Sequence, residues 1–233
     1  MELEIYQIDA FTSEVFRGNP ACVVPLNKWL DDKLLIKIAR ENNVSETAFF
    51  VKNKDGFHIR WFTPDIEMDL CGHATLASAY CLKQYLNYPG DEILFNSKSG
   101  TIKSKFVKDK IELKLPLREP KKVEIPHNLS NAINYKPLEV LKARDFILVF
   151  DNQLKIENIK IKRSEFDKIN IDPGGVVFTS QGNNCDFVSR FFTPQSSIFE
   201  DSVTGSSHCS LVPYWSRKLN KKKLKSIQLS DRT

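Results

Sequence analysis

The chain has 233 residues, of which 41% are hydrophobic, so two small domains with real cores are expected. Its net charge of +5 comes with no basic patch interleaved with aromatic residues, which argues against a nucleic-acid partner. No apolar run approaches the ~20 residues needed to cross a bilayer, and no signal peptide is recognisable, so no membrane partner is expected. Five cysteines, an odd number, favour reduced thiols and a cytoplasmic location.

The hydrophobic pattern of the first half alternates between strands and helices. Strands are predicted for Glu4–Ala10, Ala21–Val24, Glu46–Val51 and Phe57–Phe62, with three further short strands within Ile93–Leu117. Helices are predicted from Asp31 or Asp32 to about Asn42, and from Gly72 to about Leu86. Three prolines then crowd a polar stretch, at positions 116, 120 and 126. We place the domain boundary there, which gives an N-terminal lobe of residues 1–117 and a C-terminal lobe of residues 118–233.

The second half follows a similar order. Strands are predicted for Asp145–Phe150, Gly175–Ser180 and Phe187–Phe192, and a helix is predicted from Gly205 to about Leu219. Pro213 lies inside that helix and is expected to kink or shorten it, because proline lacks the backbone N–H of a helix interior.

A short motif occurs once in each half. Arg60-Trp61-Phe62-Thr63-Pro64 returns as Arg190-Phe191-Phe192-Thr193-Pro194. Each copy is followed by an acidic residue and then by a glycine that begins a predicted helix: Asp69 and Gly72 in the first copy, Asp201 and Gly205 in the second. A chance match is the alternative, but the shared position before a helix favours duplication of a whole lobe.

Two duplicated lobes can pack around a pseudo-twofold axis, so that their equivalent helix starts face each other. Glycine at a helix start lets the backbone approach a ligand closely. The free N–H groups and the positive end of the helix dipole favour an anion. The pattern therefore predicts a clamp for a small acid in a cleft between the lobes, which would also stabilise an enolate-like charge during proton transfer.

The residues that flank the two glycines differ between the copies. His73 follows the first glycine and Ser206 follows the second, whereas Cys71 and Thr204 precede them. A racemase with two thiols would need cysteine at both preceding positions, and this chain has only one. Cys71 is either a reactive thiol near a helix start or a small, inert, buried cysteine, and the local sequence favours the second interpretation.

Glu46 is a candidate acid/base group. It opens a strand of apolar character, between Ser45 and Thr47. A half-buried glutamate has a raised pKa, which suits proton transfer near neutral pH. The alternative is a surface or helix-capping glutamate, and the local sequence alone favours this alternative.

A metal centre is not expected from the ligand-type residues considered. None of them has the paired spacing of a structural zinc site: Cys71, His73, Cys81, His208 and Cys209. The chain also has no phosphate-binding loop and no dinucleotide fingerprint. We therefore predict neither a metal nor a cofactor.

Taken in order, several segments resemble the phenazine biosynthesis PhzF-like family of isomerases, which shares the diaminopimelate epimerase fold. The resemblance extends over essentially the whole chain and rests on Asp9–Thr12, Phe16–Ala21, Ser45–Ala48, Arg60–Pro64, Cys71–Thr75, Glu200–Ser206 and Pro213–Trp215. It implies an α+β fold of two pseudo-symmetric lobes, each a barrel-like, mostly antiparallel sheet around a central helix. It also implies a glycine-rich turn and a closing strand after residues 229–232, which this chain is expected to lack.

The resemblance further implies a cofactor-independent isomerase and a homodimer. Glu46 is then the catalytic residue that moves a proton. This differs from the interpretation based on its neighbouring residues alone, which favours a surface or helix-capping glutamate. The residues expected to bind a small carboxylate substrate are Asn19, Gly72, His73, Asp201, Gly205 and Ser206, with Cys71 and Thr204 as possible additions. Thr204 in place of a second cysteine favours isomerisation by a single glutamate. The alternative is a non-catalytic binding or regulatory member of the same fold.

Overall fold

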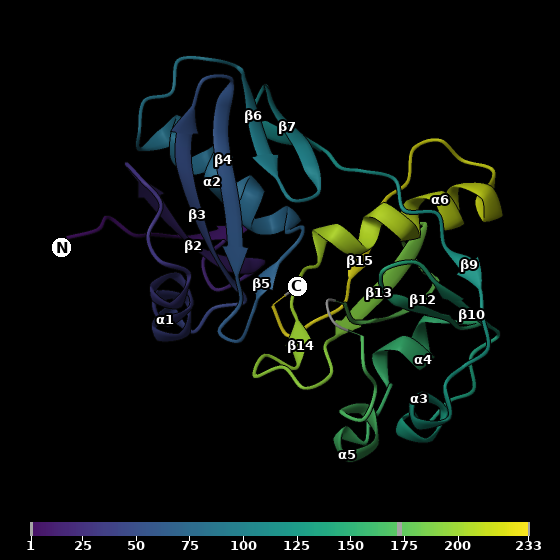
Figure 1. Ribbon diagram of the computed structural model, residues 1–233. Coiled ribbons are helices and arrows are strands. Elements are labelled where there is room, and N and C mark those ends of the chain that lie inside the picture. The colour runs from purple at the N-terminus through teal and green to yellow at the C-terminus, as the bar shows by residue number, and fades with distance from the viewer. Residues whose placement is uncertain (1, 172–173, 233) are drawn as a thin grey trace. The chain divides into compact units, whose positions relative to one another are not determined.

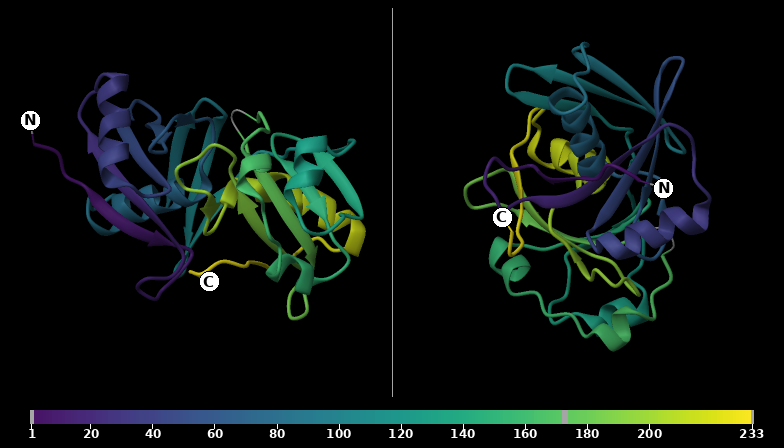
Figure 2. Two further views of the ribbon diagram at one scale, coloured as in Figure 1. Left: turned by 90° about the horizontal axis from the view of Figure 1, so that it is seen from below. Right: turned by 90° about the vertical axis from the view of Figure 1, so that its left-hand side faces the viewer.

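The computed structural model describes residues 2–171 and 174–232, and the chain divides into two compact units, Met1–Pro116 and Leu117–Thr233 (Figures 1 and 2). Each unit has one mixed sheet with a helix packed against it, Gly72–Gln84 in the first unit and His208–Leu219 in the second, besides other helices. The predicted α+β fold with two lobes, each a curled sheet with a central helix, is confirmed. No helix in the described ranges is both long enough and apolar enough to cross a membrane.

The sheet of the first unit has eight strands in the order β1-β2-β3-β4-β6-β7-β8, with β5 beside β4. Its strands are β1 (Tyr6–Ala10), β2 (Asn19–Leu26), β3 (Glu46–Asn53), β4 (Gly56–Phe62), β5 (Glu67–Met68), β6 (Glu92–Ser97), β7 (Gly100–Val107) and β8 (Lys110–Lys114). Two pairs, β2 with β3 and β4 with β6, are parallel, and the others are antiparallel. The parallel pair β2–β3 is joined by helix α1 (Asp32–Asn42), as a crossover requires.

Local signals explain the two helices of this unit. The Asp31 side chain accepts a hydrogen bond from the Lys33 N–H and caps α1, as predicted. Helix α2 (Gly72–Gln84) is buried along most of its length and contacts β1, β2, β3 and β8. Its buried positions are mainly small, among them Ala74, Ala77 and Ser78. Small side chains let this helix lie close to the surrounding strands.

The second unit has a seven-stranded sheet in the order β14-β13-β12-β11-β10-β9, with β15 beside β13. Its strands are β9 (Lys121–Lys122), β10 (Glu139–Lys142), β11 (Phe146–Val149), β12 (Val176–Gln181), β13 (Phe187–Phe192), β14 (Glu200–Asp201) and β15 (Ser226–Gln228). Its helices are α3 (His127–Ala132), α4 (Gln153–Glu157), α5 (Arg163–Phe166) and α6 (His208–Leu219). Alternate residues of β11 face two separate cores, one that includes residues of α3, α4 and α5 and one that includes residues of α6.

The internal repeat predicted from the sequence extends to the topology. Strands β2, β3 and β4 correspond to β11, β12 and β13: each set has a parallel pair followed by an antiparallel hairpin. A two-residue strand then follows in each unit, β5 or β14, and precedes the glycine-started helix. A strand after that helix, β6 or β15, pairs in parallel with β4 or β13.

The register corrects one pairing in the predicted repeat. Phe62 lies opposite Glu67, and Phe192 lies opposite Glu200. Asp201 therefore corresponds to Met68, and not to Asp69, the acidic residue that the sequence comparison paired with it. The equivalent acidic residues of the two copies are Glu67 and Glu200.

The motif arginines bind these two glutamates in the same way. Arg60 donates to Glu67 through Nε at 2.8 Å and Nη2 at 2.9 Å. Arg190 donates to Glu200 through Nε at 2.7 Å and Nη2 at 2.8 Å. Each guanidinium also lies over the ring of the motif phenylalanine, at 5.0 Å from Phe62 and 4.9 Å from Phe192. We call this arrangement the arginine clamp; it ties the short strand before each helix, β5 or β14, to the strand with which it pairs, β4 or β13.

The start of α6 differs from the prediction. Residues Gly205–Ser207 form a 3-10 turn, and the α-helix begins at His208. The Thr204 carbonyl is bonded by the side chains of Ser207, at 2.8 Å, and His208, at 3.1 Å. Side chains that bond to a backbone carbonyl in this way compete with the first helical turn.

Pro213 lies inside α6, as predicted, and the helix continues through it. Proline has no N–H to donate to the carbonyl four residues earlier, which belongs to Cys209. That carbonyl instead accepts a hydrogen bond from the Arg118 N–H at 2.9 Å. The first residues of the second unit therefore provide the bond that the helix itself lacks.

Candidate functional site

In the first unit, four predicted site residues come together at the ends of three elements. Asn19 begins β2, Glu46 begins β3, and His73 lies in the first turn of α2, two residues after its N-cap residue Cys71. The His73 side chain is 2% exposed and that of Glu46 is 13% exposed. Because β2 and β3 are parallel neighbours, their first residues lie at the same end of the strands.

The contacts of His73 favour one tautomer of its imidazole ring. Asn19 Nδ2 lies 3.3 Å from His73 Nδ1, and Glu46 Oε2 lies 3.3 Å from His73 Nε2. An amide nitrogen can only donate, so we assign Nδ1 as the acceptor and place the ring proton on Nε2. The Cys71 Sγ, at 3.5 Å, also lies on the Nδ1 side. A neutral imidazole in this tautomer donates its N–H toward the Glu46 carboxylate.

The corresponding segment of the second unit holds hydrogen-bonding groups in place of the histidine and the thiol. Asp201 Oδ2 accepts from the Thr204 hydroxyl at 2.5 Å. Ser206, which follows Gly205, is buried, and its Oγ accepts from Arg144 Nη1 at 3.4 Å. The predicted residues thus form two groups, one in each unit.

Gln228 is a residue of this second group that the sequence did not indicate. Its Oε1 accepts from the Thr204 N–H at 2.7 Å, and its Nε2 donates to the Asp201 carbonyl at 2.6 Å and to the Thr204 hydroxyl at 3.1 Å. The side chain is 6% exposed and extends from β15, a three-residue strand without a recognisable pattern. Gln228 therefore fixes the segment that leads into Gly205.

Replacing Gln228 by leucine is expected to lower the free energy of unfolding by about 2 kcal/mol, because buried backbone groups lose their partners. Urea unfolding measures this change. The matched control is Gln181→Leu, since Gln181 ends β12 on the surface. Equal stability of the two variants would show that the Gln228 bonds contribute little.

His208 lies directly after the 3-10 turn and bonds through both ring nitrogens, to the Thr204 carbonyl and to the Ser226 hydroxyl. Burial lowers the pKa of His208 below its usual value, and the bond to Thr204 only partly opposes this. The unfolded chain therefore binds the proton more readily, with a pKa of about 6.5. Stability should fall as the pH drops through this value, because protonation then favours the unfolded state.

Replacing His208 by glutamine is expected to weaken this pH dependence, because glutamine can bond to both partners without titrating. Thermal unfolding of both proteins is compared at about pH 7.5 and about pH 5.5, roughly one pH unit above and below the unfolded pKa. An unchanged difference between the two pH values would assign the effect to other groups.

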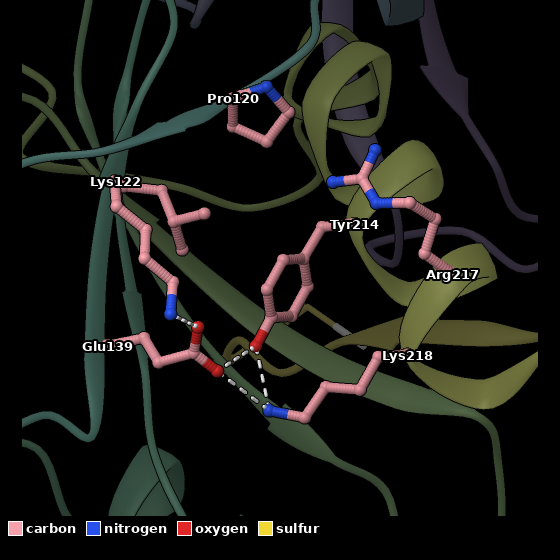
Figure 3. A pocket seen from close by; sticks show the side chains of 7 residues that line it. Pro120, Lys122, Glu139, Tyr214, Arg217 and Lys218 are labelled. Atoms are coloured by element: carbon pink, nitrogen blue, oxygen red, sulfur yellow. Dashed lines mark hydrogen bonds and ion pairs between the residues drawn. The ribbon is translucent and has the colours of Figure 1, made fainter.

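A pocket on the second unit contains none of the predicted site residues. It has a volume of about 430 Å³ and is lined by Pro120, Lys122, Glu139, Leu141, Tyr214, Arg217 and Lys218. The side chains of Lys122, Tyr214 and Lys218 point toward the Glu139 carboxylate (Figure 3). Burial alone would raise the pKa of Glu139, but the hydrogen bonds from these three groups outweigh it and lower the pKa. The carboxylate at the centre of this cluster is thus held in its charged form.

The two curled lobes repeat one architecture, and one of them holds a mostly buried carboxylate–imidazole pair, so the chain is of the two-lobed α+β class. Residues 8–232 match the family described as phenazine biosynthesis-like protein. The chain belongs to this family, and the resemblance predicted from its motifs is confirmed.

Relatives and solved structures agree with this assignment. An uncharacterized isomerase of Pseudomonas aeruginosa is 43% identical over all of this chain and 88% of its own length. The human phenazine biosynthesis-like domain-containing protein is 37% identical over all of this chain and 90% of its own. The crystal structure of a PhzF-family protein from Enterococcus faecalis has 39% identity and a TM-score of 0.89, and covers 100% of this chain and 89% of that one.

The fold extends to more distant proteins. A probable proline racemase from Agrobacterium radiobacter, solved with bound carbonate, has 8% identity and a TM-score of 0.63. The match covers 95% of this chain and 79% of that one. At this identity the likeness concerns the fold alone.

Proposed function

We propose that the protein is an isomerase that moves a proton within a small carboxylic-acid substrate without a cofactor, and that Glu46 is its acid/base group. The observation that carries the proposal is the Glu46–His73 pair, with 3.3 Å between the carboxylate oxygen and Nε2. The family membership and the relatives named as isomerases support the reaction class.

In the proposed reaction, Glu46 accepts a proton from a carbon next to an unsaturated or carboxyl-bearing group. The electron pair of the broken C–H bond spreads into that group, and Glu46 then returns the proton to another carbon of the same molecule. The N–H of His73 holds the carboxylate oxygen in place while it is charged. The Glu46 side chain is 13% exposed, so it is mostly buried but keeps some exposed surface.

The glycine-started helices are the proposed sites for the substrate's negative charge. Neither Cys71 nor Thr204 caps the following N–H groups with its side chain. Backbone N–H groups at a helix start favour an anion, and glycine leaves room for it. Asn19, His73, Asp201 and Ser206 are the proposed polar contacts around it, and Cys71 and Thr204 flank them. As the family resemblance implies, we also propose a homodimer, and sedimentation analysis would test this assembly. The odd number of cysteines supports a cytoplasmic location as a further proposal.

Exchange of hydrogen with the solvent tests this function. The protein is incubated in D₂O with a panel of small unsaturated and hydroxylated carboxylic acids, and mass spectrometry follows deuterium in each acid. Isomerisation through Glu46 places solvent deuterium on carbon, since the carboxylic acid can exchange its proton with water. Binding of an acid in calorimetry without any exchange or rearrangement would instead indicate a non-catalytic binding protein.

A further inference from the structure

The site in the first unit contains three groups of the kinds that bind transition metals. One ligand atom each of Glu46, Cys71 and His73 lies within 4.8 Å of the other two. In the part of the chain that the structure describes, residues 2–171 and 174–232, no other trio of such residues meets this spacing. Spacing along the sequence could not indicate the trio, because Glu46 lies on a different element from the other two.

One distance within the trio already suits zinc. Zinc binds carboxylate oxygen and imidazole nitrogen at about 2.0–2.1 Å and thiolate sulfur at about 2.3 Å, usually as a tetrahedron. Two ligand atoms of such a tetrahedron lie about 3.3 Å apart for oxygen and nitrogen and about 3.6 Å apart when one is sulfur. Glu46 Oε2 and His73 Nε2 are already 3.3 Å apart. The Cys71 Sγ lies 3.5 Å from His73 Nδ1, so the thiol side chain has to turn toward the Nε2 side of the ring to complete the ligand set.

We propose that Glu46, Cys71 and His73 bind one zinc ion, and that zinc turns off proton transfer. His73 would bind through Nε2, so its ring proton moves to Nδ1, where the Asn19 amide can turn its oxygen to accept it. The thiol proton of Cys71 goes to solvent, because zinc takes the thiolate. The fourth position is left for water. The inhibition rests on the proposed function: a Glu46 oxygen bound to zinc is no longer a free base.

Cobalt provides the test of binding, since it replaces zinc and reports a thiolate ligand by a charge-transfer band in the near ultraviolet. Cobalt and then zinc are titrated into the full chain and into two variants, Cys71→Ala and Cys81→Ala. Cys81 is the matched control: it is a buried thiol on α2 whose pKa burial raises to about 12, and it lies outside the trio.

The wild type and Cys81→Ala should show the band, and zinc should abolish it. Cys71→Ala should lack the band and bind zinc at least about tenfold more weakly. Loss of a residue that only supports a ligand already weakens metal binding by about 10- to 100-fold, and Cys71 would be a ligand itself. The same band in Cys71→Ala, or no band in the wild type, would overturn the site. These outcomes do not depend on turnover. If zinc binds as expected but Glu46→Gln keeps its exchange activity, the zinc site stands and the proposed function fails.

Discussion

Replacement of Glu46 by glutamine is expected to lower the rate of substrate hydrogen exchange by about 10²- to 10⁴-fold, the usual contribution of a positioned acid/base group. Glutamine keeps the length and shape of the side chain, and its amide oxygen can still accept the N–H of His73. It cannot accept a proton from carbon. The loss should therefore appear in exchange and turnover, with little change in substrate binding.

A second glutamate provides the control for this experiment. Glu139→Gln removes a carboxylate that is also half-buried and hydrogen-bonded but lies in the second unit, outside the proposed site. This variant should keep its exchange rate. Circular dichroism and thermal unfolding of both variants separate loss of chemistry from loss of fold. Exchange by Glu46→Gln within about twofold of wild type, far below the expected acid/base effect, would falsify the assignment of Glu46.

Replacement of Arg190 by methionine is expected to lower the free energy of unfolding by about 2–3 kcal/mol, somewhat less than for a fully buried ion pair that loses one partner. The Glu200 side chain is 27% exposed and would lose both of its bonds from the guanidinium. Arg190 Nη1 also donates to the carbonyls of Ile156 and Glu157 at the end of α4, each at 3.3 Å. Methionine keeps much of the apolar stem but replaces none of these bonds.

The same change in the first unit should cost less. Without Arg60, Glu67 still has Lys98, whose Nζ lies 2.6 Å from Oε2. Burial alone would raise the pKa of Glu67, but the bonds from Arg60 and Lys98 together lower it. We therefore expect Arg60→Met to be less destabilising than Arg190→Met.

Urea unfolding of these variants measures both effects. Arg163→Met is the control, because Arg163 is 49% exposed where it pairs with Asp167, and exposed pairs contribute only about 0–1 kcal/mol. Adding Glu200→Gln to Arg190→Met should restore part of the stability, since no charge is then left without its arginine. If Arg190→Met is no less stable than the Arg163 control, the arginine clamp does not stabilise its lobe.

The elements predicted from the sequence are those with a long hydrophobic pattern. Helix α1 and strand β4 show an apolar period, and strands β3 and β13 are runs of mostly apolar residues. Helix α2, which is buried along most of its length, is recognisable instead by its glycine start and its small residues. The elements that were not predicted are short. Strand β9 is two exposed lysines, and α5 has four residues, which is too few to reveal a helical face. Their positions depend on contacts that a local pattern does not contain.

The site shows the same limit. From its neighbours alone, Glu46 was interpreted as a surface or capping glutamate, yet it is half-buried against a histidine from another element. The resemblance to a family, not the local sequence, predicted its role, and that role stays a prediction. Gln228 had no signal at all, because its importance comes from the backbone groups of a distant loop.

The two lobes share one architecture within a single chain. Comparing them separates the residues that both lobes keep from the residues that differ between them. Both copies keep the motif arginine, its glutamate partner and the glycine that starts the helix. They differ next to that glycine, where one copy has Cys71 and His73 and the other has Thr204 and Ser206. The two copies therefore share the framework and differ at the positions beside the glycine. These positions are where a change of substrate could evolve, or be engineered, without rebuilding either lobe.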